Sequence, residues 1–328
     1  MKRRSVFSVV MTLCVAILLG GCGAKPALTL GPDKQSTAYE VKDSQENVVK
    51  LAQKPHRIVS LTLGTDEILL GLVPVERITA LTYLADDPGI SNIAEQAKQI
   101  PKKVKANPEE IIALQPDLLI IADWQPVELI QTIRGAGIPV YVYKTPNTII
   151  GIKKVIGEIA QVVGEEETGK EMVAQMDQQL SLVSTALSKV NPEQQKTVVR
   201  FSLMGGSGGA GSLFDDVCQY AKVVNGAAKV GIGMNELMSK EQVVQANPQI
   251  FILPTWDYTG KTDLNQFKAD MLHDPAFQTI PAIKEKQLFM LPDRYLASPS
   301  QYIVGGVRDV AKAAYPQYIN IIVKRLEG

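Results

Sequence analysis

The chain has few of the residues from which metal and catalytic centres are usually built. Its 328 residues include two histidines, three cysteines and 6% aromatic residues. A site for bare zinc or manganese would need several nitrogen, thiolate or carboxylate ligands. We therefore expect neither a metal site nor a cofactor of the protein's own, and any metal it handles should arrive already chelated.

Net charge is also lacking, because Lys plus Arg and Asp plus Glu both number 34. This balance provides no electrostatic reason to expect a nucleic-acid partner. Hydrophobic residues, by contrast, are abundant and make up 45% of the chain. A sizeable core can therefore form, and wholesale disorder is excluded.

The first 22 residues have the pattern of a secretory signal. Basic residues at 2–4 precede an almost wholly apolar run at 6–19, followed by Gly20, Gly21 and Cys22. Leu19 to Cys22 resembles the bacterial lipoprotein box. We expect residues 1–21 to be removed, Cys22 to carry lipid, and the protein to be extracytoplasmic, with this anchor as its only membrane attachment. Cys218 is then the one unmodified thiol, so no internal disulfide is expected.

Strand-like and helix-like segments alternate along most of the remaining chain. Arg57 to Leu61, "DLLIIA" and "PVYVY" are typical strands, and helical segments separate them. Residues 148–190 keep helical spacing for longer than an ordinary crossover, with a possible break at Gly164. The pattern predicts an α/β fold: two Rossmann-like lobes with parallel sheets, joined by a long rigid helix. The predicted boundaries are a lipidated N-terminus and flexible tether at 22–53, a first lobe at 54–147, the helical backbone at 148–190 and a second lobe at 191–328.

An internal repeat supports the two-lobe prediction. Residues 109–118 align without gaps on residues 241–250, and each copy is a helix, a proline and an apolar strand. The stretch "TLGTDEILLGL" at 62–72 turns into a helix, and we expect Thr65 to be its N-cap.

The stretch "MGGSGGAGS" at 204–212 has three interpretations. It contains GxGxxG, but no lysine follows and no free dinucleotide supply exists outside the cytoplasm. It contains GxSxG, so Ser207 with Asp257 and His273 forms an esterase alternative, although glycines delay the following helix. The third interpretation is a loop that lets its backbone approach a ligand, which places Gly206 and Ser207 in a binding site.

Aromatic residues follow four predicted strands, where the loops of the two lobes should face each other. Such residues suit a cleft for a large organic ligand. Lys103 belongs to a basic tract that could attract an anion, and Arg294 could clamp a carboxylate or phosphate. With the first strand–helix loop, the predicted ligand-binding set is Leu63, Gly64, Tyr83, Lys103, Trp124, Gly206, Ser207, Trp256, Tyr258, Arg294 and Tyr295.

Several segments together resemble a known family. "HRIVSLTLGTDEILLGL", "NPEEIIALQPDLLIIADW" and "DPAFQTIPAIKEKQLFMLP" are similar, in this order, to segments of the substrate-binding lipoproteins of ABC importers for iron–siderophores, haem and cobalamin. These are the class III periplasmic binding proteins, with a helical backbone between the lobes. The resemblance covers the chain from about residue 54 to its end.

The resemblance implies a non-enzymatic monomer that delivers its ligand to a permease dimer with ATPase subunits. In the family, each lobe presents one glutamate to the permease, and the matching residues here are Glu109 and Glu241. Haem and cobalamin binders of the family carry aromatic ligands before the "NPEE" segment, where this chain has Lys102 and Lys103. This difference favours an anionic ferric chelate as the ligand, with haem or cobalamin as alternatives. A ligand-sensing lipoprotein without a permease is the other alternative to transport.

Overall fold

The structure is a computed structural model that describes residues 38–320, which lie within one compact unit, Thr37–Gly328. The predicted signal peptide, Cys22 and residues 22–37 of the tether lie outside the described residues. Within 38–320, no helix combines the length and the apolar character needed to cross a membrane.

The predicted tether is wrong for its last part, because residues 39–51 form a β-hairpin. Strand β1 (Tyr39–Lys42) pairs antiparallel with β2 (Val48–Leu51). Its alternate residues Val41, Val49 and Leu51 are buried. The buried carboxylate of Asp43 also accepts a 2.6 Å hydrogen bond from Nη2 of Arg134. This short alternation of apolar residues gave too weak a pattern for the strands to be predicted.

A parallel five-stranded sheet forms what we call the N-terminal lobe (residues 39–143). The strand order is β5-β4-β3-β6-β7, which is the 3-2-1-4-5 order of a Rossmann half. Successive strands are added on one side of β3 up to β5 and on its other side from β6 onward, so the strand order switches between β3 and β6. The strands are β3 (Ile58–Ser60), β4 (Ile78–Thr82), β5 (Lys103–Val104), β6 (Leu118–Ala122) and β7 (Val140–Tyr143). The helices are α1 (Leu63–Leu72), the 3-10 helix η1 (Val75–Arg77), α2 (Ala94–Ala97), α3 (Pro108–Ala113) and α4 (Val127–Gly135).

Local sequence explains how these elements begin and end. Every residue of β6 is buried, as expected for a central parallel strand. Helix α1 begins at Leu63, and its N-cap is Thr62, whose side chain accepts from the Thr65 backbone N–H at 3.3 Å. The prediction of Thr65 as the N-cap is wrong by one turn. Thr62 has the extended backbone that a cap requires, whereas Thr65 is already helical.

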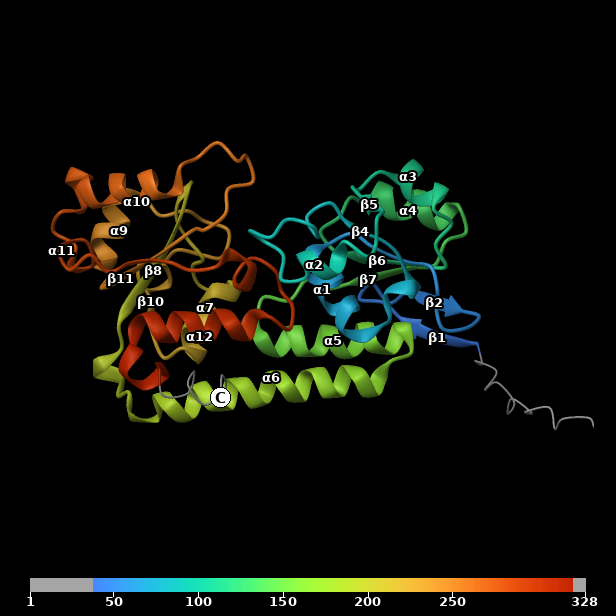
Figure 1. Cartoon of the computed structure of the whole chain (residues 1–328), viewed down its shortest axis with the longest axis horizontal. Helices are drawn as coiled ribbons and strands as arrows, with labels where there is room; N and C mark the ends of the chain where they lie inside the picture. The colour runs from blue at the N-terminus through green and yellow to red at the C-terminus, as the bar shows by residue number, and fades with distance from the viewer. Residues whose placement is uncertain (1–37, 321–328) are drawn as a thin grey trace, which may run out of the picture. The chain divides into compact units, whose positions relative to one another are not determined.

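Two helices follow β7 and are divided at Gly164, as predicted. Helix α5 (Ile149–Val163) ends at Gly164, whose φ of 73° is left-handed, and α6 (Glu166–Ala186) follows after one further residue. The two helices lie side by side (Figure 1), and a Cβ on Gly169 would lie 2.4 Å from Cβ of Ala160. With 21 residues, α6 is about 30 Å long.

The C-terminal lobe (residues 197–314) contains the second sheet, with the order β10-β8-β11-β12 in parallel and β9 antiparallel to β8. Its strands are β8 (Thr197–Ser202), β9 (Gly205–Ser207), β10 (Val224–Asn225), β11 (Ile250–Leu253) and β12 (Leu288–Met290). Its α-helices are α7 (Leu213–Tyr220), α8 (Gly226–Lys229), α9 (Lys240–Ala246), α10 (Leu264–His273), α11 (Pro281–Lys284) and α12 (Ile303–Ala314). The short 3-10 helices are η2 (Leu187–Lys189), η3 (Pro192–Gln194), η4 (Pro275–Phe277) and η5 (Asp293–Tyr295), the first two of which lead from α6 into this lobe.

The internal repeat is present in the backbone as well as in the sequence. Helix α3 leads to β6, and α9 leads to β11, the strand next to β8. The residue before each proline, Gln115 or Asn247, has a left-handed φ, of 48° and 50° respectively. The two lobes therefore repeat one helix–turn–strand unit.

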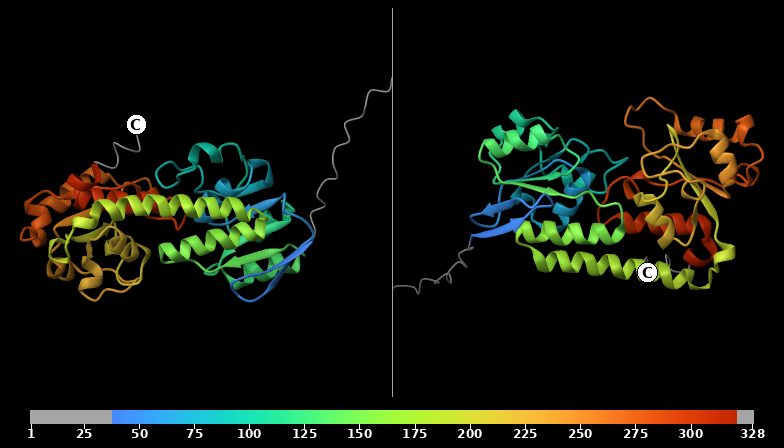
Figure 2. Two further views of the ribbon diagram at one scale, coloured as in Figure 1. Left: turned by 90° about the horizontal axis from the view of Figure 1, so that it is seen from below. Right: turned by 180° about the vertical axis from the view of Figure 1, so that it is seen from behind.

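Helix α6 packs against elements of both lobes, namely α1 of the N-terminal lobe and α7 and α12 of the C-terminal lobe. The views in Figure 2 show α6 beneath both sheets. One hydrophobic cluster runs from β3 and α1 through α5 and α6 to α12. The predicted fold, two Rossmann-like lobes on a long helix, is confirmed, and this shared core opposes hinging because interiors are close-packed.

Candidate functional site

A cavity of about 550 Å³ lies at the carboxyl ends of the parallel strands, where open α/β sheets bind their ligands. Its lining includes residues that follow β3 and β6, the two neighbouring strands between which the strand order of the N-terminal sheet switches. All but five of its residues come from the N-terminal lobe, and one of the five, Thr145, lies just after that lobe. Those that line it are Leu61–Gly64, Thr82–Leu84, Ile90, Val104–Ala106, Trp124, Gln125, Tyr143 and Thr145, with Trp256 and Ala297–Pro299 from the C-terminal lobe.

Exposed aromatic rings flank this interlobe cavity. Tyr83 and Trp124 are 57% and 64% exposed, which is unusual for such large side chains. The ammonium of Lys105 lies 5.2 Å from the centroid of the Tyr83 ring. Lys105 is the one Lys, Arg, Asp or Glu among the residues that line the cavity. The walls can therefore stack on a flat organic ligand and attract a negative one.

Hydroxyl groups supply the polar part of the cavity wall. The hydroxyl oxygens of Thr62 and Tyr143 are 2.7 Å apart, and those of Thr62 and Thr65 are also 2.7 Å apart. Burial raises the pKa of Tyr143 above its usual value, so its phenol stays protonated at neutral pH. These groups can orient a ligand by hydrogen bonding without adding charge.

Trp256 forms the main C-terminal wall and is held at its backbone. The buried carboxylate of Asp293 accepts from the N–H groups of Thr255 and Trp256 at 2.7 and 3.1 Å. The other oxygen of Asp293 lies 3.2 Å from Nη2 of Arg200. The indole N–H of Trp256 donates to Asp87 of the N-terminal lobe at 2.7 Å.

Further hydrogen bonds join the lobes near the cavity. The carboxylate of Glu67 accepts from the hydroxyl of Ser300 and from the Asn92 amide, and the backbone oxygen of Glu67 accepts from Gln301 at 2.7 Å. The Asn92 amide also donates to the Arg294 backbone oxygen at 2.6 Å. The two lobes thus contact each other directly as well as through α6.

The structure brings five of the eleven predicted ligand residues to the cavity and places six elsewhere. Leu63, Gly64, Tyr83, Trp124 and Trp256 line it. Tyr258 is 81% exposed, with its ring centroid 6.4 Å from that of Trp256. The other five do not line the cavity: Lys103, Gly206, Ser207, Arg294 and Tyr295.

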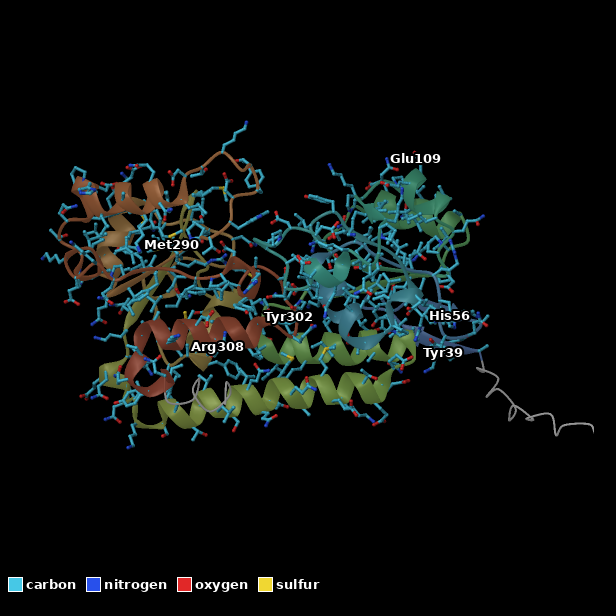
Figure 3. All side chains as sticks on the ribbon, in the orientation of Figure 1. Tyr39, His56, Glu109, Met290, Tyr302 and Arg308 are labelled. Carbon is cyan, nitrogen blue, oxygen red and sulfur yellow. The ribbon has the colours of Figure 1, made fainter. Side chains whose placement is uncertain are left out.

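Three of those five are held by other groups. Lys103 donates to the backbone oxygens of Ala97 and Ile100 and pairs with Asp86 at 3.1 Å. The Arg294 guanidinium lies 5.1 Å from the Tyr295 ring centroid. Tyr295 lines a separate groove along α6, beside Tyr302 and Arg308, which are labelled in Figure 3.

The glycine stretch folds against its own lobe. Strand β9 returns along β8, and Gly206 contacts Met238. A Cβ on Gly209 would lie 2.2 Å from the backbone oxygen of Ile232, so only glycine fits there. Gly205 and Gly208 have φ values of 122° and 76°. The stretch thus packs backbone against backbone inside the C-terminal lobe.

The residues of the esterase alternative are bonded to other groups. The Asp257 carboxylate accepts from Thr259, Lys261 and Thr262 of its own loop. Nδ1 of His273 lies 2.8 Å from the Ala269 backbone oxygen. Among the hydrogen bonds of residues 38–320, none joins Ser207, Asp257 and His273, so these side chains do not form a hydrogen-bonded triad.

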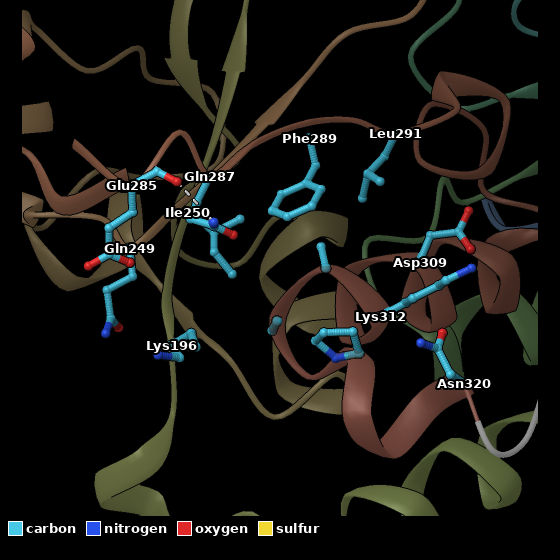
Figure 4. A pocket seen from close by; sticks show the side chains of 13 residues that line it. Lys196, Gln249, Ile250, Glu285, Gln287, Phe289, Leu291, Asp309, Lys312 and Asn320 are labelled. Atoms are coloured by element: carbon cyan, nitrogen blue, oxygen red, sulfur yellow. Dashed lines mark hydrogen bonds between the residues drawn. The ribbon is translucent and has the colours of Figure 1, made fainter. Parts of the chain in front are cut away.

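A second hollow, of about 510 Å³, lies at the opposite end of the C-terminal sheet (Figure 4). Lys196, Gln249 and Gln287 precede β8, β11 and β12, so one end of the hollow lies at the amino ends of these strands, and the rest runs between β12 and α12. Parallel sheets bind ligands at the carboxyl ends instead. This hollow also involves one lobe only, so the interlobe cavity is the better candidate. Within residues 38–320, no group of three or more His, Cys, Asp or Glu side chains is placed to hold a metal ion.

Glu109 and Glu241 occupy equivalent places in the two lobes. Each lies in the first turn of its helix, α3 or α9, and each is exposed. Figure 3 shows Glu109 at the edge of the N-terminal lobe. Hydrogen bonding within the first turn, above all with Ser239, lowers the pKa of Glu241, so its carboxylate is negative at neutral pH.

Sequence reasoning missed several cavity residues. Thr62 and Tyr143 end or follow strands that were predicted correctly, so their position at strand ends was an available signal. Lys105 belongs to the same basic tract as Lys103, and the sequence does not distinguish which of the two reaches the cavity. Ala297–Pro299 carried no signal, since they reach the cavity only through the packing of the lobes.

Comparisons with known proteins agree with this fold. A family model described as "Periplasmic binding protein" matches residues 58–295. The molybdate-binding protein MolA of Haemophilus influenzae is 24% identical over 87% of this chain and 84% of its own, and its molybdate-bound structure has a TM-score of 0.72.

Two further relatives have other ligands in their names. The iron-uptake system-binding protein of Bacillus subtilis is 22% identical over 88% of this chain and 91% of its own. The apo structure of the periplasmic heme-binding protein RhuT from Roseiflexus sp. RS-1 is 24% identical, with a TM-score of 0.67, and the match covers 80% of this chain and 98% of that one.

Proposed function

Because the chain belongs to the periplasmic binding protein family, we propose that it captures an anionic ferric chelate of the siderophore class and delivers it to an ABC importer. The observation that carries this proposal is the interlobe cavity, with aromatic walls and a single basic side chain. The relatives' names cover molybdate, iron uptake and haem, so family membership leaves the ligand open.

The size and charge of the cavity favour a bulky anion. A volume of about 550 Å³ falls within the range of organic-ligand pockets and exceeds what a bare oxyanion fills. Lys105 adds a positive charge beside Tyr83, and no Asp or Glu lines the cavity to oppose it. A ferric chelate with aromatic groups would satisfy both features.

Location and delivery complete the proposal. Residues 1–22 support export and a lipid anchor on Cys22. The exposed pair Glu109 and Glu241 supports docking to a permease, with one carboxylate from each lobe. No covalent step is required of the protein, and the energy for transport comes from ATP hydrolysed by other subunits.

Native mass spectrometry tests the ligand class directly. The protein without residues 1–37 is mixed separately with a ferric tris-catecholate chelate, haem and cobalamin, and a one-to-one complex with the ferric chelate is expected to be the tightest. Preferential binding of haem or cobalamin would contradict the ligand assignment. Absence of binding by all three would contradict the uptake proposal, whereas binding without an uptake defect in a deletion strain would favour a ligand-sensing lipoprotein.

A charge variant sharpens the test. Lys105→Gln should weaken ferric-chelate binding about tenfold, which corresponds to about 1.4 kcal/mol. Lys102→Gln is the matched control, since Lys102 pairs with Glu110 at 3.5 Å and does not line the cavity. Equal effects of the two variants would point to the general field of the lobe rather than to a contact.

A further inference from the structure

We infer that Asp87 is a positioning residue for ligand capture, which holds the Trp256 indole across the interlobe cavity and so fixes the wall that the C-terminal lobe contributes. Asp87 does not line the cavity itself. The inference rests on the proposed function in one respect, that this cavity is the ligand site. The contact on which it depends can be tested without a ligand.

The contact joins residues far apart in sequence and belonging to different lobes. Nε1 of Trp256 donates to Oδ2 of Asp87 at 2.7 Å. No ion pair of residues 38–320 includes Asp87. A hydrogen bond to a carboxylate is about twice as strong as one between neutral groups. This interaction is therefore well suited to holding a large side chain in one orientation.

The turn that carries Asp87 is built to receive the indole. Oδ1 of Asp87 accepts from the Gly89 N–H at 2.9 Å, and the Asp87 backbone oxygen accepts from Ser91 at 2.9 Å. A Cβ on Gly89 would lie only 2.5 Å from Cδ1 of Trp256. The indole thus lies directly against the Gly89 backbone, while one carboxylate oxygen secures the turn and the other binds the ring.

Trp256 is consequently fixed at both ends. Asp293 holds its backbone N–H from within the C-terminal lobe at 3.1 Å, and Asp87 holds its side chain from the opposite lobe. A wall fixed before the ligand arrives reduces the entropy lost on binding. Removal of the Asp87 acceptor should free the indole to change rotamer, and ligand affinity should fall although no direct ligand contact has been removed.

Nuclear magnetic resonance of the indole N–H groups tests the contact. The chain contains two tryptophans, so two indole N–H signals are expected, and Trp124→Phe identifies the Trp256 signal. In the full-length protein, the nearly isosteric Asp87→Asn should weaken the acceptor and move the Trp256 proton signal upfield. The Trp124 signal should stay in place. Asp86→Asn is the matched control, because Asp86 is the neighbouring acid and pairs with Lys103.

A complete loss of the side chain provides the second measurement. In the Trp124→Phe background, Asp87→Ala should increase acrylamide quenching of Trp256 by about twofold or more, because the indole loses its charge-assisted hydrogen bond. Asp86→Ala should leave quenching unchanged. An unmoved Trp256 signal in Asp87→Asn, or equal responses of the Asp86 and Asp87 variants, would overturn the inference.

Binding of the ferric tris-catecholate chelate connects the contact to function. Asp87→Ala should lower its affinity about tenfold, or about 1.4 kcal/mol, whereas Asp86→Ala should not. If the chelate fails to bind the unmodified protein, the proposed function fails while the spectroscopic result on Asp87 stands. If it binds Asp87→Ala with unchanged affinity, the positioning role is refuted and the proposed function survives.

Discussion

The N-terminal and C-terminal lobes repeat the same helix–turn–strand unit but use the ends of their strands differently. In the N-terminal lobe, residues that follow β3 and β6 line the cavity, among them Leu63 and Gly64 at the start of α1 and Trp124 after β6. In the C-terminal lobe, the chain leaves β8, turns back and returns as β9. The equivalent position is thus occupied by backbone of the lobe itself.

Glycine makes this difference possible. Backbone of 205–211 packs against residues 232–238 so closely that side chains at Gly206 or Gly209 would clash. The C-terminal lobe therefore reaches the cavity only from β11, through Trp256, and from residues 297–299. The two lobes share a repeated unit but have different roles at the cavity. The N-terminal lobe supplies most of its lining, and the C-terminal lobe supplies the rest.

The buried acids of the molecule differ in how their charge is compensated. Asp293 of the C-terminal lobe is paired with Arg200. In the N-terminal lobe, Asp66 and Glu67 are fully buried, and no ion pair of the described residues includes them. Burial raises the pKa of Asp66 to about 8 and that of Glu67 to about 7. Asp293 is thus neutralised by a cation, as Asp43 of the N-terminal lobe is by Arg134, whereas Asp66 and Glu67 are neutralised by protons.

The largest expected effect tests whether the lobes are equivalent in docking. Glu109→Ala combined with Glu241→Ala should abolish uptake in a deletion strain and leave chelate affinity unchanged, because both carboxylates are exposed and lie outside the cavity. Each single variant should reduce uptake to a similar extent. Glu110→Ala is the control on the same helix, and a loss of chelate affinity in the double variant would contradict the docking role.

The next effect concerns the acid of the C-terminal lobe. Asp293→Ala should lower the free energy of unfolding by about 3–5 kcal/mol, because Arg200 and the N–H groups of Thr255 and Trp256 lose their acceptor. Urea denaturation measures the change. Glu46→Ala, which removes an exposed ion pair with Lys42, should have little effect. Equal losses of unfolding free energy in Asp293→Ala and Glu46→Ala would contradict the expectation that the buried acid contributes more to stability than the exposed one.

A pH-dependent effect, smaller than the preceding one per pH unit, concerns Asp66 and Glu67 of the N-terminal lobe. Asp66 has a pKa of about 8 when folded against 3.8 when unfolded, and Glu67 about 7 against 4.5. The stability that their neutral forms provide is complete below about pH 4 and is lost as pH rises through 7 and 8. Between these limits the free energy of unfolding falls by at most about 1.4 kcal/mol per pH unit for each acid.

Asp66→Asn should remove the contribution of Asp66 to that decrease. Denaturation of the two proteins at pH 5, 6, 7 and 8 measures it, and parallel curves for them would show that Asp66 is ionised in the folded state. Asp309→Asn, in an ion pair with Arg308 on α12, serves as the control.

The smallest effect is expected at the glycine stretch. Ser207→Ala should leave chelate affinity and uptake unchanged, since Ser207 does not line the cavity. Isothermal titration of the chelate and an uptake assay measure this. An esterase activity that disappears in the variant would restore the enzyme alternative and show that the C-terminal lobe has a site of its own.

Much of the fold could be predicted because its signals are local. Alternation of apolar runs and amphipathic segments predicted the sheets, and the glycine at 164 predicted the break between α5 and α6. The hairpin of β1 and β2 was missed because strands of four residues are too short for an alternating pattern to be distinct. The N-cap of α1 was placed one turn late because Thr62 and Thr65 are equally good capping residues in the sequence.

The candidate site was only partly predictable. Aromatic residues at strand ends identified Tyr83, Trp124 and Trp256, since parallel strands present their carboxyl ends at one edge. The choice between Lys103 and Lys105 depends on which residue the backbone turns toward the cavity. In the structure, Lys103 pairs with Asp86, and Lys105 approaches Tyr83.

By itself, the sequence determined the elements, the repeated unit and the long helix between the lobes, because helix and strand periods and capping residues act over a few positions. Only the tertiary structure decided that the glycine stretch packs against its own lobe, and that Asp87 of one lobe meets Trp256 of the other. The physical reason is distance along the chain. Contacts between residues so far apart in sequence form when the lobes pack on α6, and no local pattern encodes them.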